Sequence, residues 1–286
     1  MLLVNTKQLF AEAQSRKFAI PATNFIDLDS ARAYVEVAEE RGLPLILAFA
    51  QSHKDILSLE EASLIGKYFA EKATVPIALH LDHGADTEYI FKAIELGFKS
   101  VMIDASEESF EDNIMISKKV VDYAHQFGVT VEAELGHVGA NDNSESSEIT
   151  HSIYTEVNDV IQFVEETKVD SLAVSIGTAH GVYKGKPKLS FERLDEIANM
   201  TDIPLVLHGG SSTGDENLNR CAISGIVKIN IYSDFINGAL QEIQNEKPSN
   251  YIELKEIANQ KMKSILSHYY DVFQTQRVEI KGENNE

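Results

Sequence analysis

Short apolar runs recur along the chain and alternate with longer stretches in which apolar residues return every three or four positions. The apolar runs are KFAIPATNF, LPLILAFA, VPIALHL, SVMIDA, VTVEAEL, SLAVSI, PLVLH and IVKINI. Because they are continuously apolar rather than alternating, they are typical of strands with both faces covered. The helical spacing between most of them predicts helices within 31–40, 60–71, 89–96, 113–126, 157–166 and 193–200.

Eight strands with intervening helices in 286 residues favour a closed barrel over an open doubly wound sheet. We therefore predict an α/β fold in which residues 1–286 form a single (β/α)8 TIM barrel domain. Residues 251–270 predict an extra C-terminal helix, and the polar chain from Gln274 onward is expected to fray. Two long connections, 136–152 and 177–190, follow strands and are expected to cover the rim of the barrel as lids.

Composition and charge restrict the class of function. A hydrophobic content of 43% is sufficient for a substantial core, and a net charge of −20 without a basic face argues against a nucleic-acid partner. The single cysteine, Cys221, excludes an internal disulfide framework and fits a reducing compartment. No apolar run approaches the ~18 residues of a membrane span. We expect a soluble cytoplasmic protein with no membrane partner.

Three histidines follow three different predicted strands. His83 ends IALHLDH, His180 lies in SLAVSIGTAHG, and His208 ends PLVLH. Residues just past the strand ends collect at one rim of a barrel, so these rings are expected to meet there. Three imidazoles and one open position are typical of a catalytic divalent-metal site. Each histidine alone is more often structural or merely exposed, so the prediction depends on their shared position in the fold.

Acidic residues accompany these histidines. A buried lone carboxylate is costly, but Asp82 beside a metal would stay ionised and could move a proton; its alternative role is a helix N-cap. Asp104 after SVMI and Glu134 in VEAELG could orient the histidines or hold a second metal position. Glu132 alternates with Glu134 and is interpreted as a solvent-facing or core-lining residue. His80 is interpreted as a neighbour of the site rather than a ligand.

The last two predicted strands are followed by a candidate phosphate site. Segment 208–212, HGGSS, follows the seventh strand, and segment 228–233, KINIYS, ends the eighth strand and opens a helix. Loops at these places in barrels commonly bind phosphate through backbone N–H groups and a helix N-terminus. Ser211 and Ser233 would add hydroxyl donors. Two residues of the sixth loop could close over the same phosphate: Gly181 and Lys184. Such a local site lets an acidic protein bind an anion.

Together these segments resemble the class II, zinc-dependent aldolases, in the branch that includes tagatose-bisphosphate and fructose-bisphosphate aldolases. The resemblance extends over nearly the whole chain, through NTKQLFAEAQ, IPATNF, LDHG, SVMIDAS, VEAELG, SLAVSIGTAHG, LVLHGGS and KINI. It implies a lyase that reversibly cleaves a ketose (bis)phosphate to dihydroxyacetone phosphate and an aldehyde, with Zn²⁺ stabilising the enediolate. It also implies a monovalent cation, Na⁺ or K⁺, beside the phosphate, and a homodimer or homotetramer.

The resemblance also implies a role for each matched residue. Asp82 corresponds to the catalytic proton donor and acceptor. The residues expected at the metal are His83, His180 and His208 as zinc ligands, with Glu134 and Asp104 near a mobile metal position. The expected substrate-binding residues are Asn24, Gly181, Lys184, Gly209, Gly210, Ser211, Asn230, Ile231, Tyr232 and Ser233.

Several positions depart from the family pattern. Ser212 replaces a common glycine, and Tyr232 is bulky where Ala or Thr is usual. Ala50, with Ser52 nearby, stands where bisphosphate aldolases tend to have a Ser or Thr that contacts the far phosphate. A ketose 1-phosphate is therefore an alternative substrate, although Arg277 or Lys255 could supply a far-phosphate contact.

Two further functions compete with the aldolase. The chain could be a non-catalytic sugar-phosphate-binding or regulatory subunit, but a degenerate relative would be expected to have lost a ligand or Asp82. A metal-dependent hydrolase barrel is disfavoured because IPATNF lacks the paired His-X-His that such barrels usually carry on the first strand.

Overall fold

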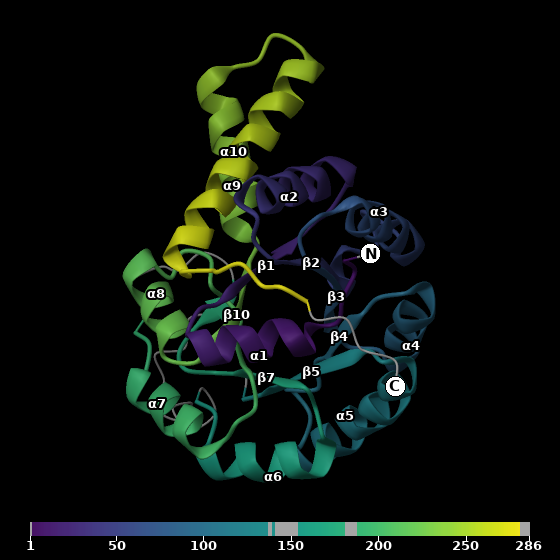
Figure 1. Ribbon diagram of the computed structural model, residues 1–286, viewed down its shortest axis with the longest axis vertical. Helices are drawn as coiled ribbons and strands as arrows, with labels where there is room; N and C mark the ends of the chain where they lie inside the picture. Colours follow the sequence, from purple (N-terminus) through teal and green to yellow (C-terminus); the bar gives the residue numbers. More distant parts are fainter. Residues whose placement is uncertain (1, 137–138, 141–153, 181–187, 281–286) are drawn as a thin grey trace.

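The computed structural model describes residues 2–136, 139–140, 154–180 and 188–280, and for 139–140 and 179–180 it describes the backbone alone. Eight parallel strands form a closed barrel in the order β1-β10-β9-β7-β5-β4-β3-β2, surrounded by helices (Figure 1). The predicted (β/α)8 barrel with an extra C-terminal helix is confirmed. No helix in the described part of the chain has both the length and the apolar character needed to cross a bilayer.

The barrel strands coincide with the eight apolar runs of the sequence. They are β1 (Ile20–Asn24), β2 (Leu45–Ala50), β3 (Ile77–Gly84), β4 (Ser100–Ile103), β5 (Thr130–Leu135), β7 (Ser171–Val174), β9 (Leu205–Leu207) and β10 (Ile226–Ile231). Every residue of these strands is buried except His83, which is partly exposed at the end of β3. Two short strands outside the barrel, β6 (Gly139–Ala140) and β8 (Ala179–His180), pair in parallel with each other.

All six helices predicted between the strands are present, and so is the C-terminal helix. The helices are α1 (Thr6–Arg16), α2 (Leu28–Arg41), α3 (Leu59–Lys72), α4 (Thr87–Leu96), α5 (Phe110–Ala124), α6 (Val157–Thr167), α7 (Phe191–Met200), α8 (Asp215–Ile223), α9 (Ser233–Glu246) and α10 (Tyr251–Val272). Side-chain N-caps set several of their starts, including the capping boxes of Asp27 with Ser30 and of Ser58 with Glu61. Helices α1 and α8 were not predicted.

Helix α1 closes the N-terminal end of the barrel, across which it lies in Figure 1. Its apolar residues Leu9, Phe10 and Ala13 pack into a cluster with inward-facing residues from the starts of β1, β2, β3 and β10. The hydroxyl groups of Thr6 and Thr130 are 2.7 Å apart and tie α1 to the start of β5. This end of the barrel is therefore apolar and sealed.

Helices α9 and α10 pack against each other as a hairpin that projects from the barrel, and α10 also packs on α2 (Figure 1). The expected fraying from Gln274 onward is wrong for residues 274–280. The Thr275 hydroxyl donates to the Ala19 carbonyl at 2.6 Å, and Arg16 donates to the Arg277 carbonyl at 2.9 Å. Val278 is buried in the α1 cluster, so an apolar anchor in a polar sequence holds this segment in place.

Candidate metal centre and active site

A cavity of about 230 Å³ lies at the C-terminal ends of the barrel strands. Residues from β1, β2, β3 and β10 and from the segments after β2, β9 and β10 line it. They are Asn24, Ala50, Ser52, His53, Asp82, His83, His208, Gly209, Ser211, Asn230, Tyr232 and Ser233. Residues predicted from distant parts of the sequence therefore share one cavity, at the end where barrels carry their active sites.

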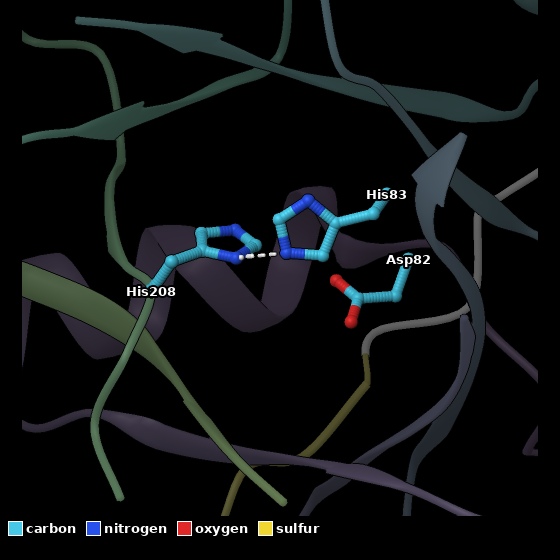
Figure 2. A group of neighbouring side chains, drawn as sticks. All are labelled: Asp82, His83 and His208. Atoms are coloured by element: carbon cyan, nitrogen blue, oxygen red, sulfur yellow. Dashed lines mark hydrogen bonds between the residues drawn. The ribbon is translucent and has the colours of Figure 1, made fainter. Parts of the chain in front are cut away.

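Two of the three predicted metal ligands are in contact. The Nε2 atom of His83 lies 2.9 Å from the Nδ1 atom of His208 (Figure 2). On the far side of each ring is a carboxylate: Asp104 Oδ2 is 2.8 Å from His83 Nδ1, and Glu132 Oε1 is 2.9 Å from His208 Nε2. A carboxylate accepts hydrogen bonds, so these contacts place a proton on the outer nitrogen of each ring and leave the two facing nitrogens bare.

Two bare imidazole nitrogens at this distance repel unless a cation or a proton lies between them. A tetrahedral Zn²⁺ with Zn–N bonds of about 2.0–2.1 Å would hold two such nitrogens roughly 3.3 Å apart, so a small separation of the rings accommodates it. Burial alone would lower the pKa of His83, but the charges of Asp82 and Asp104 raise it to about 9. In the metal-free chain a proton on His83 therefore replaces the cation. The donor set fits a divalent metal.

Two overlapping groups of side chains could hold a metal. One consists of Asp82, His83 and His208, and the other of His83, Asp104 and Glu134. His83 belongs to both groups, and the other two members of the second group are the carboxylates Asp104 and Glu134. The second group fits the predicted mobile position.

The third predicted ligand, His180, lies in β8, where its backbone pairs with Ala140 of β6. Its side chain lies outside the described part of the structure, so its role as a ligand stays a prediction. Gly181 and Lys184, predicted to close over the phosphate, also lie outside the described residues.

The backbone of His83 explains how two consecutive residues reach the same site. Successive side chains of a strand point to opposite faces, so Asp82 and His83 should not both point into the cavity. His83, however, has φ of 47°, and the pairing of β3 with β4 shifts register between Leu81 and Gly84. A side chain on Gly84 would lie 2.5 Å from the Met102 carbonyl, so the turn requires glycine there. Such strained backbone is typical of functional sites.

Asp82 is 3% exposed, and two amides fix both of its carboxylate oxygens. Asn24 Nδ2 donates to Oδ2 and Asn230 Nδ2 to Oδ1, each at 2.8 Å. Burial would raise the pKa of Asp82, but neighbouring imidazole and ammonium charges outweigh it and hold the pKa well below its usual range. The alternative role as a helix cap is wrong, because Asp86 caps α4.

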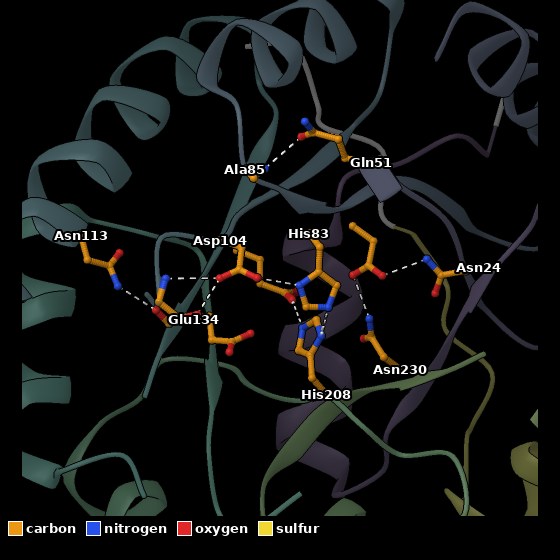
Figure 3. A network of polar contacts seen from close by, with 12 residues as sticks. Asn24, Gln51, His83, Ala85, Asp104, Asn113, Glu134, His208 and Asn230 are labelled. Carbon is orange, nitrogen blue, oxygen red and sulfur yellow. Dashed lines mark hydrogen bonds and ion pairs between the residues drawn. The ribbon is translucent and has the colours of Figure 1, made fainter. Parts of the chain in front are cut away.

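Asp104 and Glu134 approach His83 from β4 and β5 (Figure 3). Asp104 uses Oδ2 for His83, while its Oδ1 accepts hydrogen bonds from the backbone N–H and the hydroxyl of Ser106 at 3.2 and 2.8 Å. Burial would raise the pKa of Asp104, but these hydrogen bonds and the His83 charge lower it. Glu134 is 2% exposed, and Asn113 fixes its strand by donating to its carbonyl at 3.0 Å.

The sequence did not reveal the partners of Glu132. The core-lining alternative is confirmed: Glu132 is 1% exposed, contacts His208, and forms a salt bridge with Lys228 at 2.8 Å. His80 is a neighbour of the site, as predicted, since it contacts Ser100 and Lys228. The sequence did contain one indication of this contact: Glu132 and Lys228 have opposite charges and both lie at inward-facing positions of barrel strands, the fifth and the eighth.

The loop after β9 packs against the end of β10. The Gly210 N–H donates to the Asn230 carbonyl at 3.1 Å, and a Cβ on Gly210 would lie 2.7 Å from that oxygen. The Ser211 hydroxyl accepts hydrogen bonds from the N–H groups of Tyr232 and Asp234 at 3.1 and 3.3 Å, which caps the N-terminus of α9 from outside the helix. A glycine-containing turn therefore meets a helix N-terminus, which is a favourable environment for an anion.

Ser212, one of the departures from the family pattern, has φ of 61°, a conformation that favours glycine. Asp234 compensates by accepting hydrogen bonds from the Ser212 N–H and hydroxyl at 3.0 and 3.1 Å. Tyr269 of α10 in turn donates to Asp234. The C-terminal helix thus supports the turn.

Of the predicted substrate-binding residues in the described chain, most line the cavity; Gly210 and Ile231 do not. Ile231 is fully buried in the core between the barrel and the helices. A substrate contact at Ile231 would therefore have to come from the backbone.

The outer wall of the cavity contains Ala50, Ser52 and a ring pair that the sequence did not reveal. The His53 and Tyr232 rings lie 4.7 Å apart at 42°. Burial lowers the pKa of His53 and Asp82 acts in the opposite direction, so the ring is neutral at pH 7. Lys255 forms a salt bridge with Asp29.

Arg277, the other residue considered for a far phosphate, lines a separate cavity with Leu2 and Pro76. Neither Arg277 nor Lys255 contributes to the lining of the site within this chain.

Comparisons with known proteins agree with this geometry. A family model described as class II fructose-bisphosphate aldolase matches residues 4–277. The YdjI aldolase from Escherichia coli K12 has 32% identity and a TM-score of 0.87, with 96% of this chain and 98% of that chain covered. A proposed fructose-1,6-bisphosphate aldolase from Coccidioides immitis has 27% identity and a TM-score of 0.83, with 93% and 94% covered. Fructose-bisphosphate aldolase from Campylobacter jejuni, at 23% identity, TM-score 0.79 and 96% coverage of both chains, shares the fold.

Proposed function

Because the chain belongs to the class II fructose-bisphosphate aldolase family, we propose that it reversibly cleaves a ketose phosphate to dihydroxyacetone phosphate and an aldehyde. One observation carries this proposal: the Asp82 carboxylate, fixed by two amides, lies beside the facing nitrogens of His83 and His208 (Figure 2). The candidate proton carrier and the candidate metal ligands therefore line the same small cavity.

We propose Zn²⁺ as the metal, held by His83 and His208 with His180 as the third ligand, and with Asp104 and Glu134 at the second position. When bound, the metal supplies Lewis acidity that stabilises negative charge on the substrate oxygens. With a metal bound, Asp104 and Glu132 would accept the protons on the outer nitrogens of His83 and His208, which leaves the facing nitrogens of both rings available as ligands.

We assign proton transfer to Asp82. In the cleavage direction the Asp82 carboxylate accepts the proton of the C4 hydroxyl. The C3–C4 bond then breaks, and the electron pair of that bond passes to the ketone fragment. The C4–O bond becomes the carbonyl of the aldehyde, and Asp82 returns the proton to C3. Asn24 and Asn230 hold the carboxylate in the orientation that this exchange requires.

The phosphate of the substrate would lie at the turn after β9. Gly209, Ser211 and Ser233 line the cavity beside the N-terminus of α9, whose dipole favours an anion. A monovalent cation beside this phosphate would offset part of the net charge of −20.

The outer wall favours a second candidate, a ketose 1-phosphate instead of a bisphosphate. Ala50 offers no hydroxyl for a far phosphate, and the neutral ring of His53 packs on Tyr232. Among the described residues that line the cavity there is no lysine or arginine. Turnover on tagatose 1,6-bisphosphate, fructose 1,6-bisphosphate and several ketose 1-phosphates, measured side by side, distinguishes the two candidates.

The proposed reaction is tested by a coupled assay for dihydroxyacetone phosphate before and after complete metal removal. We expect activity to be lost with a chelator and restored by Zn²⁺; activity that survives would contradict the metal-dependent mechanism. An Asp82→Ala variant with the turnover of the parent would contradict the assignment of proton transfer to Asp82, and a parent without turnover on any of these substrates would support the non-catalytic, regulatory role.

A further inference from the structure

A second polar layer lies inside the barrel, one step deeper than the metal centre. His80, Glu132 and Lys228 each stand two residues before a residue of the mouth: Asp82, Glu134 and Asn230. Residues two apart on a strand share a face, so these side chains also point into the barrel. All three are at most 1% exposed. A layer of buried polar and charged side chains therefore lies directly beneath the residues at the C-terminal end of the barrel.

Contacts account for every proton of the Lys228 ammonium group. Its Nζ atom lies 2.8 Å from both oxygens of Glu132 and 3.2 Å from Nε2 of His80. An ammonium group only donates, so His80 accepts through Nε2 and carries its proton on Nδ1, which is 2.8 Å from the Ser100 hydroxyl. The two contacts with Lys228 fix the position and the plane of the Glu132 carboxylate.

Glu132 transmits this arrangement to the metal centre. Its Oε1 atom accepts the hydrogen bond of His208 Nε2, which leaves Nδ1 of that ring bare and directed at His83. Only a bare nitrogen can ligate a metal. The tautomer of His208 therefore depends on a carboxylate whose orientation depends on Lys228.

Stability alone gives a poor account of this buried pair. Taking two charges out of water is costly, and replacing a buried ion pair by uncharged residues of similar volume is often neutral or stabilising. A role at the neighbouring metal centre accounts for the pair better.

We propose that Lys228 is a positioning residue of the metal centre, which holds His208 through Glu132 in the tautomer that binds the metal. The proposal rests on the metal site of the proposed function. Lys228 itself contacts neither the facing imidazole nitrogens nor the cavity. Without Lys228, the Glu132 carboxylate loses both contacts that fix it, and the His208 ring can exchange between its two tautomers.

The test compares the parent with Lys228→Met, the double variant Lys228→Met/Glu132→Gln, and the control Ser100→Ala. Ser100 is 2% exposed and belongs to the same layer, but it lies on the other side of Lys228 from His208. Long-range ¹H–¹⁵N spectra of ¹⁵N-histidine-labelled, metal-free protein report the His208 tautomer, and a His208→Asn spectrum assigns its signals. Competition with a chromophoric chelator measures the affinity for Zn²⁺.

We expect His208 to be protonated on Nε2 in the parent and in Ser100→Ala, and to show mixed tautomers in Lys228→Met. We expect Zn²⁺ affinity to fall by about 10–100-fold in Lys228→Met, the usual effect of losing a group that orients a ligand, and by less than about threefold in the control. If Lys228→Met does not fold, the double variant, which has no unpaired charge, carries the same expectation.

Different outcomes separate this inference from the proposed function. A parent chain that binds no Zn²⁺ would contradict the metal centre itself. A parent that binds Zn²⁺, with a folded Lys228 variant that matches it in affinity and in His208 tautomer, would overturn the role of Lys228 alone. An Nδ1-protonated His208 in the parent would overturn it as well.

Discussion

The two ends of the barrel differ in what fills them: apolar side chains at the N-terminal end, and charged and polar side chains at the C-terminal end. At the N-terminal end, Leu9 and Phe10 of α1 fill the interior with apolar side chains, and the Thr6 hydroxyl closes the edge. At the C-terminal end, Asp82 is buried as a charge and His83 adopts a left-handed backbone conformation. The first end contributes stability, and the second holds its charges in an arrangement that is useful for chemistry. Changes at the two ends should therefore separate stability from turnover.

The largest expected effect is on turnover, at the C-terminal end. Asp82→Asn keeps the shape of the side chain but removes the proton acceptor, so we expect kcat to fall by about 10²–10⁴-fold. The new amide can accept a hydrogen bond from only one of Asn24 and Asn230, but the change also removes a buried charge, so we expect only a modest change in the melting temperature. Steady-state kinetics and thermal unfolding of one preparation measure both. Equal kcat in parent and variant would contradict the role of Asp82.

Leu9→Ala should have the opposite effect. Leu9 is fully buried in the cluster that seals the barrel, so we expect a loss of about 2–5 kcal/mol in the free energy of unfolding. Because α1 lies at the far end from the cavity, kcat per folded molecule should stay within about twofold of the parent. Urea unfolding and kinetics at a temperature where both proteins are folded provide the comparison. A tenfold loss of kcat would show that the two ends are coupled.

Gly84→Ala should affect both properties. The added methyl group would meet the Met102 carbonyl at 2.5 Å and the Ile90 side chain at 2.7 Å, in the turn that orients His83. We expect about 1–3 kcal/mol of destabilisation from this overpacking, together with weaker metal binding. Gly42→Ala is the control: an added methyl group there meets no atom within 4 Å, so any loss comes from the positive φ of Gly42, 66°, and not from a contact near His83. Metal affinity that falls equally in both variants would rule out a specific effect through His83.

The smallest effect is expected at the edge of the sealed end. Thr6→Val removes a buried hydroxyl 2.7 Å from that of Thr130, while Thr130 keeps its contact with the Lys99 carbonyl. We expect a loss of about 1 kcal/mol in the free energy of unfolding, with no change in KM. Urea unfolding measures it against Thr87→Val, a partly exposed threonine at the start of α4 whose hydroxyl accepts a hydrogen bond from Lys119. Equal losses would mean that the pair contributes nothing specific.

The same comparison explains what the sequence could predict. The barrel followed from eight apolar runs, because burial on both faces removes polar residues from a strand. Asp82, His83 and His208 followed from the topology, since residues after parallel strands meet at one end. Helix α1 could not be predicted in this way, because it has few apolar residues and these pack against the starts of strands that are distant in the sequence.

Two features of the site depend on geometry that the sequence does not show. The partnership of Glu132 with Lys228 requires the register across the closed barrel, which brings residues 96 positions apart to 2.8 Å. The left-handed conformation of His83 requires the shift between β3 and β4. The segment after Gln274 was predicted to fray because it is polar, but burial of Val278 and the hydrogen bonds of Thr275 and Arg277 hold residues 274–280 in place.

The hydrogen bond from Tyr269 to Asp234 links the tail of the chain to the mouth of the barrel. Asp234 holds the turn at Ser212, so the last long helix supports the turn that we predict to bind phosphate, although the two are far apart in the sequence. A shortened protein that ended before α10 would retain every acidic and imidazole group named at the metal. It would lack the Tyr269 hydroxyl that holds Asp234, and with it the support for Ser212 in a backbone conformation that favours glycine.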